Sequence, residues 1–359
     1  MEKRVIVSVY SPYLPKHFGG GEKHLLSVVA ALLKKNAQVS VWVDGAEDLE
    51  LAKAKYQQYF GLDLSKSIWV RRPRRTILDK LARRSAGDVH YSVTDGSLYI
   101  PNAKYNILHV QIPFTHALSA WESLKLSMWQ VIQTNSSFTA GFIEDSWGRR
   151  PEAVIYPVVD DEFFKTSQPK EKVILSIGRF FTQLHSKRQD VLIEAFKKLQ
   201  DTSYAKDWKL VLIGGVEDQQ YFSQCQQAAE GLPIEFVTDA TRQSVIDWCS
   251  KATLYWHATG FEVDELENPG MVEHFGISTA EAMASGCVPL VVPKGGQREV
   301  LGEKIVDLGW NTQAELLDKT SDLMRDSDEL AALSTWATKQ AKLFDTARFS
   351  KRIYSLFGV

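Results

Sequence analysis

Short apolar segments rich in β-branched residues alternate with helical patterns, and this alternation restricts the fold more than any other feature of the chain. In the first half the strand-like segments are residues 5–10, 39–43, 88–92, 105–110 and 131–134. Helical patterns cover about residues 22–35 and begin again at Asn135 or Ser136. Strands and helices that alternate in this way predict a parallel, Rossmann-type sheet covered by helices.

A second series of the same kind follows in the other half. Its strand-like segments are residues 172–177, 209–213, 234–237, 253–256 and 288–292, and its first helix falls at about 188–199. Residues 157–169, which are polar and flanked by prolines, form a reasonable boundary between the two series. A chain of 359 residues suits two domains. We expect ligands beyond the carboxyl ends of the strands, in the cleft between two such domains.

The composition is that of a globular protein, with 44% hydrophobic and 24% charged residues. The N-terminal sequence has no long apolar region and no cleavage site, so we expect no signal peptide. No apolar run approaches the roughly 20 residues that span a bilayer. Cys225, Cys249 and Cys287 are odd in number and widely spaced, which predicts reduced, buried thiols and no metal site. We therefore expect a cytoplasmic protein.

Positive charge is concentrated in one short segment of the first half. Residues 1–160 contain 20 Lys and Arg against 15 Asp and Glu, a net charge of +5, whereas the remainder contains 22 against 29, a net charge of −7. The basic residues of this segment are Arg71, Arg72, Arg74, Arg75, Lys80, Arg83 and Arg84. The apolar residues beside them are Trp69, Ile77, Leu78 and Leu81. The segment is either a solvated face or a peripheral contact with anionic lipid headgroups or an anionic acceptor. A pI of about 6.5 and the lack of a base-stacking motif argue against nucleic acid.

The segment EHFGISTAEAMASG, from Glu273 to Gly286, combines a glycine turn, a helix start and two carboxylates. Gly276 permits a tight turn, and Ser278 with Glu281 fits the S-x-x-E capping box. The backbone amides at the start of this helix then form an anion site. Glu273 precedes the helix, so the two carboxylates need not share a helical face.

The spacing of these glutamates, with FG after the first and EAMA-x-G around the second, resembles the donor-site signature of the retaining nucleotide-sugar glycosyltransferases of family four. Those enzymes have the GT-B fold. The segments NSSFT, VIYPVVD, VPLVVPKGGQREVL and FDTARFSKRIYSLF also look like parts of that family. The resemblance implies an α/β chain with an acceptor-side Rossmann-like domain at residues 1–160 and a donor domain at 161–340. Residues 341–359 would form a helix that returns to the first domain.

Two cations follow a predicted strand in SIGRFFTQLHSKRQDVLIEAF, residues 176–196. Arg179 comes directly after the glycine that ends the strand, and Lys187 comes eight residues later. Alone they are as easily two surface cations, but cations in this place suit a pyrophosphate leaving group. By resemblance both occupy the family's pyrophosphate-binding positions. Arg188 stands where the family usually has glycine, which is a departure from the pattern at this turn.

Two sites in the first half carry further expectations. HFGGGEKHLL, residues 17–26, is either a flexible turn or a loop whose backbone approaches a phosphate or sugar closely. Neither a P-loop nor a G-x-G-x-x-G pattern is present. By resemblance Gly20 and Gly21, with Glu22, lie beside the donor phosphates and the acceptor. His109, at the end of an apolar strand, is either a core histidine or, by resemblance, a hydrogen-bond partner of the donor sugar.

The resemblance also distributes roles around the second carboxylate pair. It implies that Glu273 binds hydroxyls of the donor sugar, with the amides of Phe275, Gly276 and Ile277 nearby. It implies that Glu281 binds the ribose. Together with His109, Arg179 and Lys187, Glu273 forms the expected catalytic set, and Ser278 completes the donor-binding set. The acidic residues from Glu262 to Glu267 lack a metal-binding arrangement, so we interpret them as a mobile solvated loop. The family is generally metal-independent, and no cofactor is expected.

The resemblance therefore implies transfer of a hexose-type sugar from a nucleoside-diphosphate sugar to a saccharide or lipid-linked acceptor, with retention of configuration. The alternatives are a GT-B sugar phosphorylase, a nucleotide-sugar epimerase, or a non-catalytic nucleotide-sugar-binding subunit. Release of free nucleoside diphosphate on turnover distinguishes the transferase from the other two enzymes. The sequence does not identify the sugar, the nucleobase or the acceptor.

Overall fold

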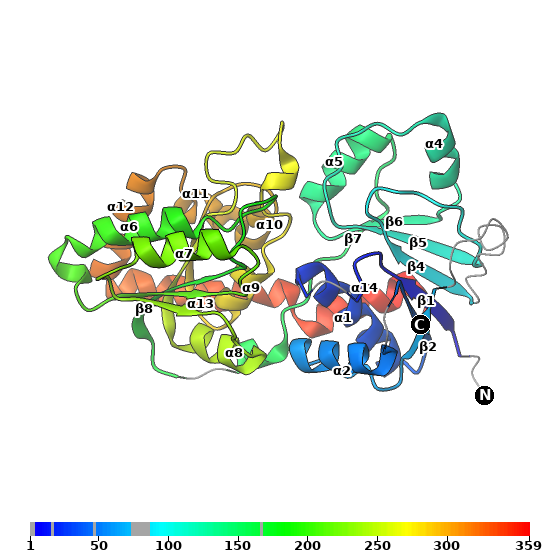
Figure 1. The fold of residues 1–359 in the computed structure, drawn as a ribbon, viewed down its shortest axis with the longest axis horizontal. Helices are drawn as coiled ribbons and strands as arrows, with labels where there is room; N and C mark the ends of the chain where they lie inside the picture. The colour runs from blue at the N-terminus through cyan, green and yellow to red at the C-terminus, as the bar shows by residue number, and fades with distance from the viewer. Residues whose placement is uncertain (1–3, 16–17, 46–47, 73–86, 166–167) are drawn as a thin grey trace. The chain divides into compact units, whose positions relative to one another are not determined.

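The computed structural model describes residues 4–15, 18–45, 48–72, 87–165 and 168–359. The chain divides into two compact units (Figure 1). Unit 1 comprises residues up to Val158 together with Ala347–Val359, and unit 2 is Val159–Thr346. No helix among the described residues is both long enough and apolar enough to cross a membrane. Cys225, Cys249 and Cys287 are all free and buried, which confirms the prediction for these thiols.

Unit 1 is built on one parallel sheet with the strand order β3-β2-β1-β4-β5-β6-β7. The strands are β1 (Ile6–Tyr10), β2 (Gln38–Val43), β3 (Ile68–Arg71), β4 (Val89–Val93), β5 (Tyr105–Val110), β6 (Val131–Thr134) and β7 (Ala153–Val154). Its helices are α1 (Gly20–Lys34), α2 (Leu49–Phe60), α4 (Ala120–Leu126), α5 (Ser137–Trp147) and α14 (Thr346–Phe357). The strand order reverses direction between β1 and β4, which makes this a doubly wound sheet with its switch point after β1.

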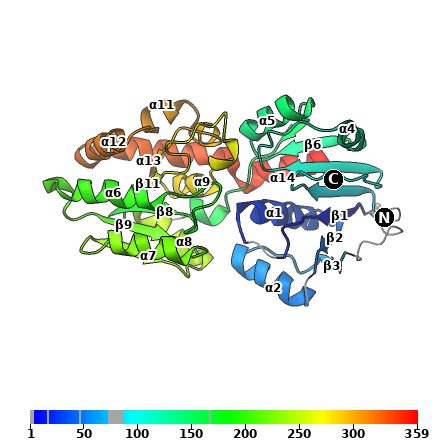
Figure 2. The same cartoon turned by 45° about the horizontal axis from the view of Figure 1, so that its top comes forward.

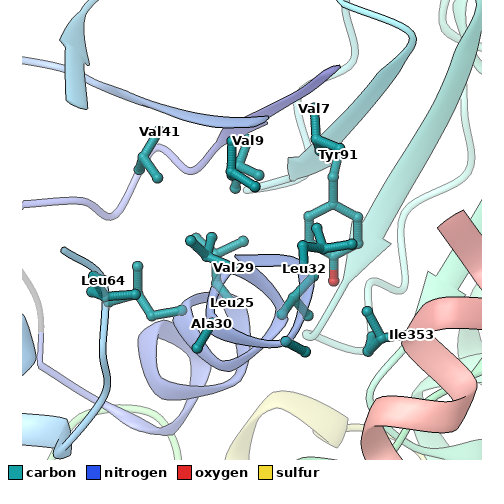
Figure 3. Close-up of a cluster of buried hydrophobic side chains, with 14 of the residues drawn as sticks. Val7, Val9, Leu25, Val29, Ala30, Leu32, Val41, Leu64, Tyr91 and Ile353 are labelled. Atoms are coloured by element: carbon teal, nitrogen blue, oxygen red, sulfur yellow. The ribbon is translucent and has the colours of Figure 1, made fainter. Parts of the chain in front are cut away.

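The core of unit 1 explains why its two distant chain segments belong together. Leu25, Val29 and Leu32 on one side of α1 face the apolar residues of β1 and β2 (Figure 3). Ile353 of α14 joins the same buried cluster, with Phe349 and Phe357 one turn away on either side. The chain therefore leaves unit 2 after α13 and its last helix, α14, completes unit 1 (Figure 2).

Unit 2 has a five-stranded parallel sheet with the order β10-β9-β8-β11-β12. The strands are β8 (Glu171–Ile177), β9 (Lys209–Ile213), β10 (Ile234–Val237), β11 (Ala252–His257) and β12 (Val288–Val291). The α-helices are α6 (Gln189–Gln200), α7 (Gln219–Ala228), α8 (Arg242–Lys251), α9 (Ile277–Ala284), α10 (Gln297–Leu301), α11 (Ile305–Leu308), α12 (Gln313–Arg325) and α13 (Ser327–Ala341). The described residues of unit 2 also form 3₁₀ turns at Asp161–Phe164, Ser203–Ala205, Pro269–Met271, Gly302–Lys304 and Lys342–Phe344. Here the strand order reverses between β8 and β11, so the loops after these two strands meet at the switch point.

Every strand segment predicted from the sequence forms a strand, to within one residue at each end. Ser136 caps α5, as one of the two predicted starts, by accepting a hydrogen bond from the amide of Thr139. The capping box predicted at Ser278 is wrong. Gly276, with φ of 104°, is the N-cap of α9, and Ser278 accepts a hydrogen bond from the Tyr255 hydroxyl instead. The buried Tyr255 hydroxyl needs a hydrogen-bond partner and finds it in Ser278, so this serine does not cap the helix.

Candidate active site

The loop between β8 and α6 carries both predicted cations at the switch point of unit 2. Gly178 ends the strand, and a Cβ atom there would lie 2.3 Å from Cγ of Lys187, so only glycine lets the lysine stem cross this backbone. A Cβ atom at Gly214, at the end of β9, would in turn lie 2.0 Å from the carbonyl oxygen of Gly178. Two glycines on adjacent strands thus create the space that Lys187 occupies.

Lys187 reaches the loop that follows β11. Its Nζ donates to Oε2 of Glu273 at 2.5 Å, and the two side chains are only 14% and 15% exposed. Nε2 of His257, the last residue of β11, donates to the same oxygen at 3.1 Å. Both contacts fall on Oε2, so Oε1 is the oxygen that these two partners leave open to a hydroxyl group. The structure therefore brings two predicted site residues together and adds His257.

The charges at this contact are fixed by burial and by the neighbours. Burial alone raises the pKa of Glu273, but the Lys187 ammonium and the hydrogen bond from His257 hold that pKa well below its usual range. Burial also lowers the pKa of His257, so the imidazole is neutral. The amide of Gln297 lies 3.3 Å from Nδ1 of His257, which places the ring proton on Nε2, toward the carboxylate. Glu273 is consequently a charged acceptor with a defined orientation.

Glycines also shape the turn before α9. Gly276 takes a positive φ, and a Cβ atom there would lie 2.8 Å from the Gln297 amide. The Gly296 amide donates to the carbonyl of Glu273 at 2.8 Å, and a Cβ atom at Gly296 would lie 2.3 Å from Cα of Phe275. Gly295 and Gly296 therefore pack directly against the backbone of Glu273 and Phe275.

The remaining predicted donor residues surround the N-terminus of α9. The Phe275 ring is buried against Phe344, with ring centroids 5.1 Å apart, so only its backbone faces the turn. Ile277 is the first residue of α9, and first-turn amides have no partner within their own helix. Glu281 is 4% exposed and its Oε1 accepts from Arg242 at 2.8 Å. Arg242 also contacts Asp160, so Glu281 belongs to a buried ion network that the sequence did not indicate.

Arg179 is held less tightly than Lys187. Its guanidinium donates to Glu217 at 2.6 Å and lies 4.7 Å from the centre of the Phe181 ring. Arg179 is 33% exposed and Glu217 is 49% exposed. An ion pair at this exposure contributes about 1 kcal/mol or less, so an anionic ligand can replace the carboxylate at small cost.

In unit 1 the glycine turn follows β1, at the switch point of that sheet. The carboxylate of Glu22 accepts from the Gly19 amide at 2.8 Å and is 6% exposed, so it holds the turn at the start of α1. A Cβ atom at Gly21 would lie 2.5 Å from Oε1 of Gln111, the residue just beyond β5. Gly21 is therefore required for the approach of the Gln111 side chain, which the sequence reasoning did not select.

His109 lies deeper than predicted for a sugar ligand. Its side chain is 0% exposed in unit 1 and stacks on His24, with ring centroids 4.7 Å apart. Burial lowers its pKa to about 4, so the ring is neutral. Gln111 lies two residues further along, on the same side of the chain, at the strand's carboxyl end. Gln111, rather than His109, is the partly exposed polar side chain at this strand end.

Two surface interpretations made from the sequence are corrected. Trp69 is not available to a membrane, because it is 6% exposed and its ring stacks on Tyr56 in the core. Arg72 stacks over the Tyr10 ring at 4.3 Å and pairs with Asp44 at 3.6 Å. Arg71 is an exposed residue at the end of β3. The other residues of the basic segment lie outside the described residues: Arg74, Arg75, Lys80, Arg83 and Arg84 with Ile77, Leu78 and Leu81.

The acidic loop after β11 is folded rather than simply solvated. Glu265 pairs with Arg298 at 2.9 Å and accepts from the Gly295 amide at 2.8 Å. Lys294 donates to the carbonyls of Gly260 and Val263. Within the part of the chain that the structure describes, no group of three or more His, Cys, Asp or Glu residues is placed to hold a metal ion.

Solved structures of similar shape define the class of the fold. A glycosyltransferase from Rickettsia africae matches 99% of this chain and 98% of its own with a TM-score of 0.73 at 13% sequence identity. The TarM protein of S. aureus, in a complex with UDP, matches 99% of this chain and 100% of its own with a TM-score of 0.69 at 10% identity. The chain thus has the GT-B fold of two Rossmann-like units, as the sequence resemblance implied.

The family follows from the sequence of unit 2. Residues 158–340 match the family of glycosyl transferases group 1, and this stretch exceeds half of the chain. The chain belongs to the group 1 glycosyl transferases. The matched stretch contains Arg179, Lys187, Glu273 and Glu281, so the candidate site lies within the part that defines the family.

Curated relatives carry more specific names. A GDP-Man:Man(3)GlcNAc(2)-PP-Dol alpha-1,2-mannosyltransferase of Neurospora crassa is 27% identical over 262 residues, which are 62% of this chain and 44% of the relative. The protein of the same name from Xenopus tropicalis is 31% identical over 180 residues, 47% of this chain and 34% of the relative. The chain spans less than half the length of these relatives.

Proposed function

We propose that the chain is a retaining glycosyltransferase that moves a hexose-type sugar from a nucleoside-diphosphate sugar to a saccharide or lipid-linked acceptor. The observation that carries the proposal is the Lys187–Glu273 contact at the switch point of unit 2, inside the family's matched region. The printed names of the relatives favour GDP-mannose as the donor and a lipid-linked saccharide as the acceptor. Among hexoses and nucleobases, mannose and guanine are therefore the first to test.

Three groups of residues bind the three parts of the donor, which are the diphosphate, the sugar and the ribose. Arg179 and Lys187 bind the diphosphate, because both lie in the loop after β8 and are cationic side chains that hydrogen-bond to phosphate oxygens. Glu273 binds sugar hydroxyls through Oε1, with the amides at the start of α9 beside it. Glu281, already oriented by Arg242, accepts from the ribose hydroxyls through its remaining capacity.

The chemistry is a substitution on one face of the sugar. The bond from the anomeric carbon to the phosphate oxygen breaks, and the bond to the acceptor oxygen forms on the same face. The acceptor's hydroxyl proton passes to the departing phosphate. Arg179, Lys187 and the first-turn amides of α9 stabilise the charge that grows on this leaving group. Since these groups supply the positive charge, the reaction proceeds without a metal ion.

Unit 1 supplies the acceptor side. The glycine turn at Gly20 and Gly21 lies at the switch point of its sheet, where its backbone can approach a ligand closely. The His109 ring is buried and stacks on His24, so it stabilises this strand end rather than contacting the sugar. The protein contacts an anionic membrane peripherally, through basic residues between Arg71 and Arg84, to reach a lipid-linked acceptor on the cytoplasmic side.

The test is a donor panel followed by turnover. UDP-, GDP- and ADP-sugars are compared for thermal stabilisation, since a ligand that binds only the native state raises its apparent stability. The preferred donor is then incubated with a lipid-linked saccharide, and free nucleoside diphosphate and glycosylated product are measured. We expect both products, unchanged by a metal chelator, with the anomeric configuration of the donor preserved in the product's NMR spectrum.

Other results would select the alternatives. Sugar phosphate formed from a glycoside and inorganic phosphate would indicate a phosphorylase. An epimerised nucleotide sugar or sugar without acceptor would indicate an epimerase. Donor binding without turnover in any acceptor would leave a binding subunit. An absence of stabilisation by every nucleotide sugar would contradict the proposal as a whole.

A further inference from the structure

His185 lies in the same loop as Arg179 and Lys187 and has no part in the mechanism above. The loop that holds it is strained. Leu184 and Arg188, neither of them glycine, both have φ of 48°, in the left-handed region that costs residues with a Cβ atom roughly 1–3 kcal/mol each. Strain of this kind persists only where the surrounding structure enforces it, and it clusters at ligand sites.

The loop is braced on both sides of His185. Oγ of Ser186 donates to the carbonyl of Phe181 at 2.9 Å, and the Ser186 amide donates to the carbonyl of Leu184 at 2.6 Å. Leu184 is pushed outward, with 60% of its surface exposed, while His185 turns inward. The backbone therefore exposes an apolar residue in order to place an imidazole, which is the reverse of what burial of apolar surface favours.

The His185 ring lies between the parts of the donor site. It meets the Phe181 ring edge-on with centroids 5.7 Å apart, and the His274 ring lies 5.5 Å away. His274 directly follows Glu273, so His185 connects the loop that carries Arg179 and Lys187 with the loop that carries Glu273. Nδ1 of His185 is buried without a hydrogen-bond partner, although the residue as a whole is partly exposed. Among the described residues, none forms a hydrogen bond with this nitrogen.

The charges around the ring explain what it can contribute. Burial, with the neighbouring Lys187 charge next in importance, lowers the pKa of His185 to about 3. His274, Glu273 and Arg179 are the other titratable groups that act on it. The ring is therefore neutral, and its contribution is a directed hydrogen bond rather than a charge. Arg179 and Lys187 are each paired with a carboxylate in the free protein, so a neutral donor adds binding without a further charge to desolvate.

We infer that His185 is a third diphosphate ligand, which donates a hydrogen bond from its imidazole to a phosphate oxygen held between Arg179 and Lys187. This inference rests on the proposed function, because it names a further residue of the same donor site. It assigns a specific purpose to the strained loop: the left-handed residues on either side turn the imidazole toward the ligand. The reaction itself gains no proton from His185, since the ring is already neutral before the donor binds.

The experiment separates hydrogen bonding from packing at one position. His185→Phe keeps an aromatic ring against Phe181 but cannot donate, whereas His185→Gln keeps a neutral donor and loses the ring. Binding of GDP and UDP to the full chain is measured by titration calorimetry, and KM for the donor and kcat are measured with the best donor sugar. His116→Ala is the matched control, because His116 is an exposed histidine of unit 1. Circular dichroism and urea midpoints show that each variant is folded.

We expect His185→Phe to weaken binding of the preferred diphosphate about tenfold, equivalent to ~1.4 kcal/mol, and to raise the donor KM more than it lowers kcat. His185→Gln should retain most of the affinity, and His116→Ala all of it. The ratio of variant to wild-type kcat/KM should be constant between about pH 5.5 and 8, because a neutral ring does not titrate there. His185→Asn provides a second neutral donor if either variant is unfolded.

Full affinity in His185→Phe, or equal losses in Phe, Gln and Asn variants, would show that the ring only packs and would overturn the inference. These outcomes differ from failure of the proposed function, in which the wild-type protein itself binds no nucleoside diphosphate. A wild-type protein that binds the diphosphate and a His185→Phe variant that binds it equally well would leave the transferase intact and remove only His185 from its site.

Discussion

Removal of Lys187 should destabilise the protein, because it leaves the Glu273 carboxylate buried with a neutral histidine as its remaining partner. Loss of one member of a buried ion pair typically costs about 3–5 kcal/mol. The two side chains are 14% and 15% exposed, so water can partly compensate, and we expect about 3 kcal/mol for Lys187→Met at pH 7. Urea unfolding followed by circular dichroism measures this free energy.

The pH dependence of this loss has a defined sign. In the wild-type protein the pKa of Glu273 is depressed, so its stabilisation is present above its unfolded-state value near 4.5 and is lost only as the pH falls through the depressed folded value. Without Lys187, burial raises the pKa of Glu273, and the carboxylate destabilises the variant increasingly as the pH rises above about 4.5. The difference between the two proteins should therefore be largest at pH 7 and shrink toward pH 4.5.

A second substitution tests the cause. Lys187→Met with Glu273→Gln removes the buried charge, so the double variant should recover much of the stability lost in the single variant while remaining inactive. A double variant as unstable as the single one, or a loss that is the same at pH 4.5 and pH 7, would refute the reasoning. Lys198→Met, which removes a half-exposed lysine paired with Glu194, is the matched control and should change the free energy of unfolding by less than about 1 kcal/mol.

Three further predictions concern ligands. Arg179→Ala should lower turnover roughly 10²- to 10³-fold in a steady-state assay, as loss of one transition-state donor commonly does, and a wild-type rate would remove it from the site. Glu281→Gln should weaken binding of the bare nucleoside diphosphate in titration calorimetry, whereas Glu273→Gln should spare it and weaken only the donor sugar, and equal weakening by both would show that the two roles are not separate. Co-sedimentation with anionic vesicles should be strong at low salt and fade as the Debye length falls below about 8 Å. Failure of wild type to bind, or undiminished binding when Arg71, Arg74 and Arg75 are replaced by serine, would contradict a contact through this segment.

The sheets were predictable because their signal is local. Residues 105–110 and 209–213 are short segments rich in apolar residues, and the structure has strands at those positions. The edge strands β3 and β7 were not predicted. β7 has only two residues, and β3 runs into the basic segment that was interpreted as a surface. Arg179, Lys187 and Glu273 were selected by resemblance, and the fold brings the last two into contact. Their roles as ligands remain predictions.

The errors arise where a partner lies far away in the sequence. The local pattern gave Ser278 and Glu281 to each other, but Tyr255 and Arg242 take them in the fold. His109 was selected by its resemblance to a histidine of the family, and its role stays a prediction, whereas His257, which also ends a strand, was not selected. Only the packing across each strand distinguishes them, since His109 meets His24 in a core and His257 meets Glu273.

Gly214 is not itself a predicted ligand, yet it has little more freedom to vary than a residue that is. An alanine there meets the Gly178 carbonyl, and any shift of that strand end displaces the lysine stem that crosses it. A search for inactive variants would therefore find position 214 beside the ligand-binding positions and invite the conclusion that it binds substrate. Intolerance to substitution at this glycine would instead reflect the close spacing of two neighbouring strand ends. A side chain at position 214 would displace the Gly178 carbonyl and, with it, Lys187.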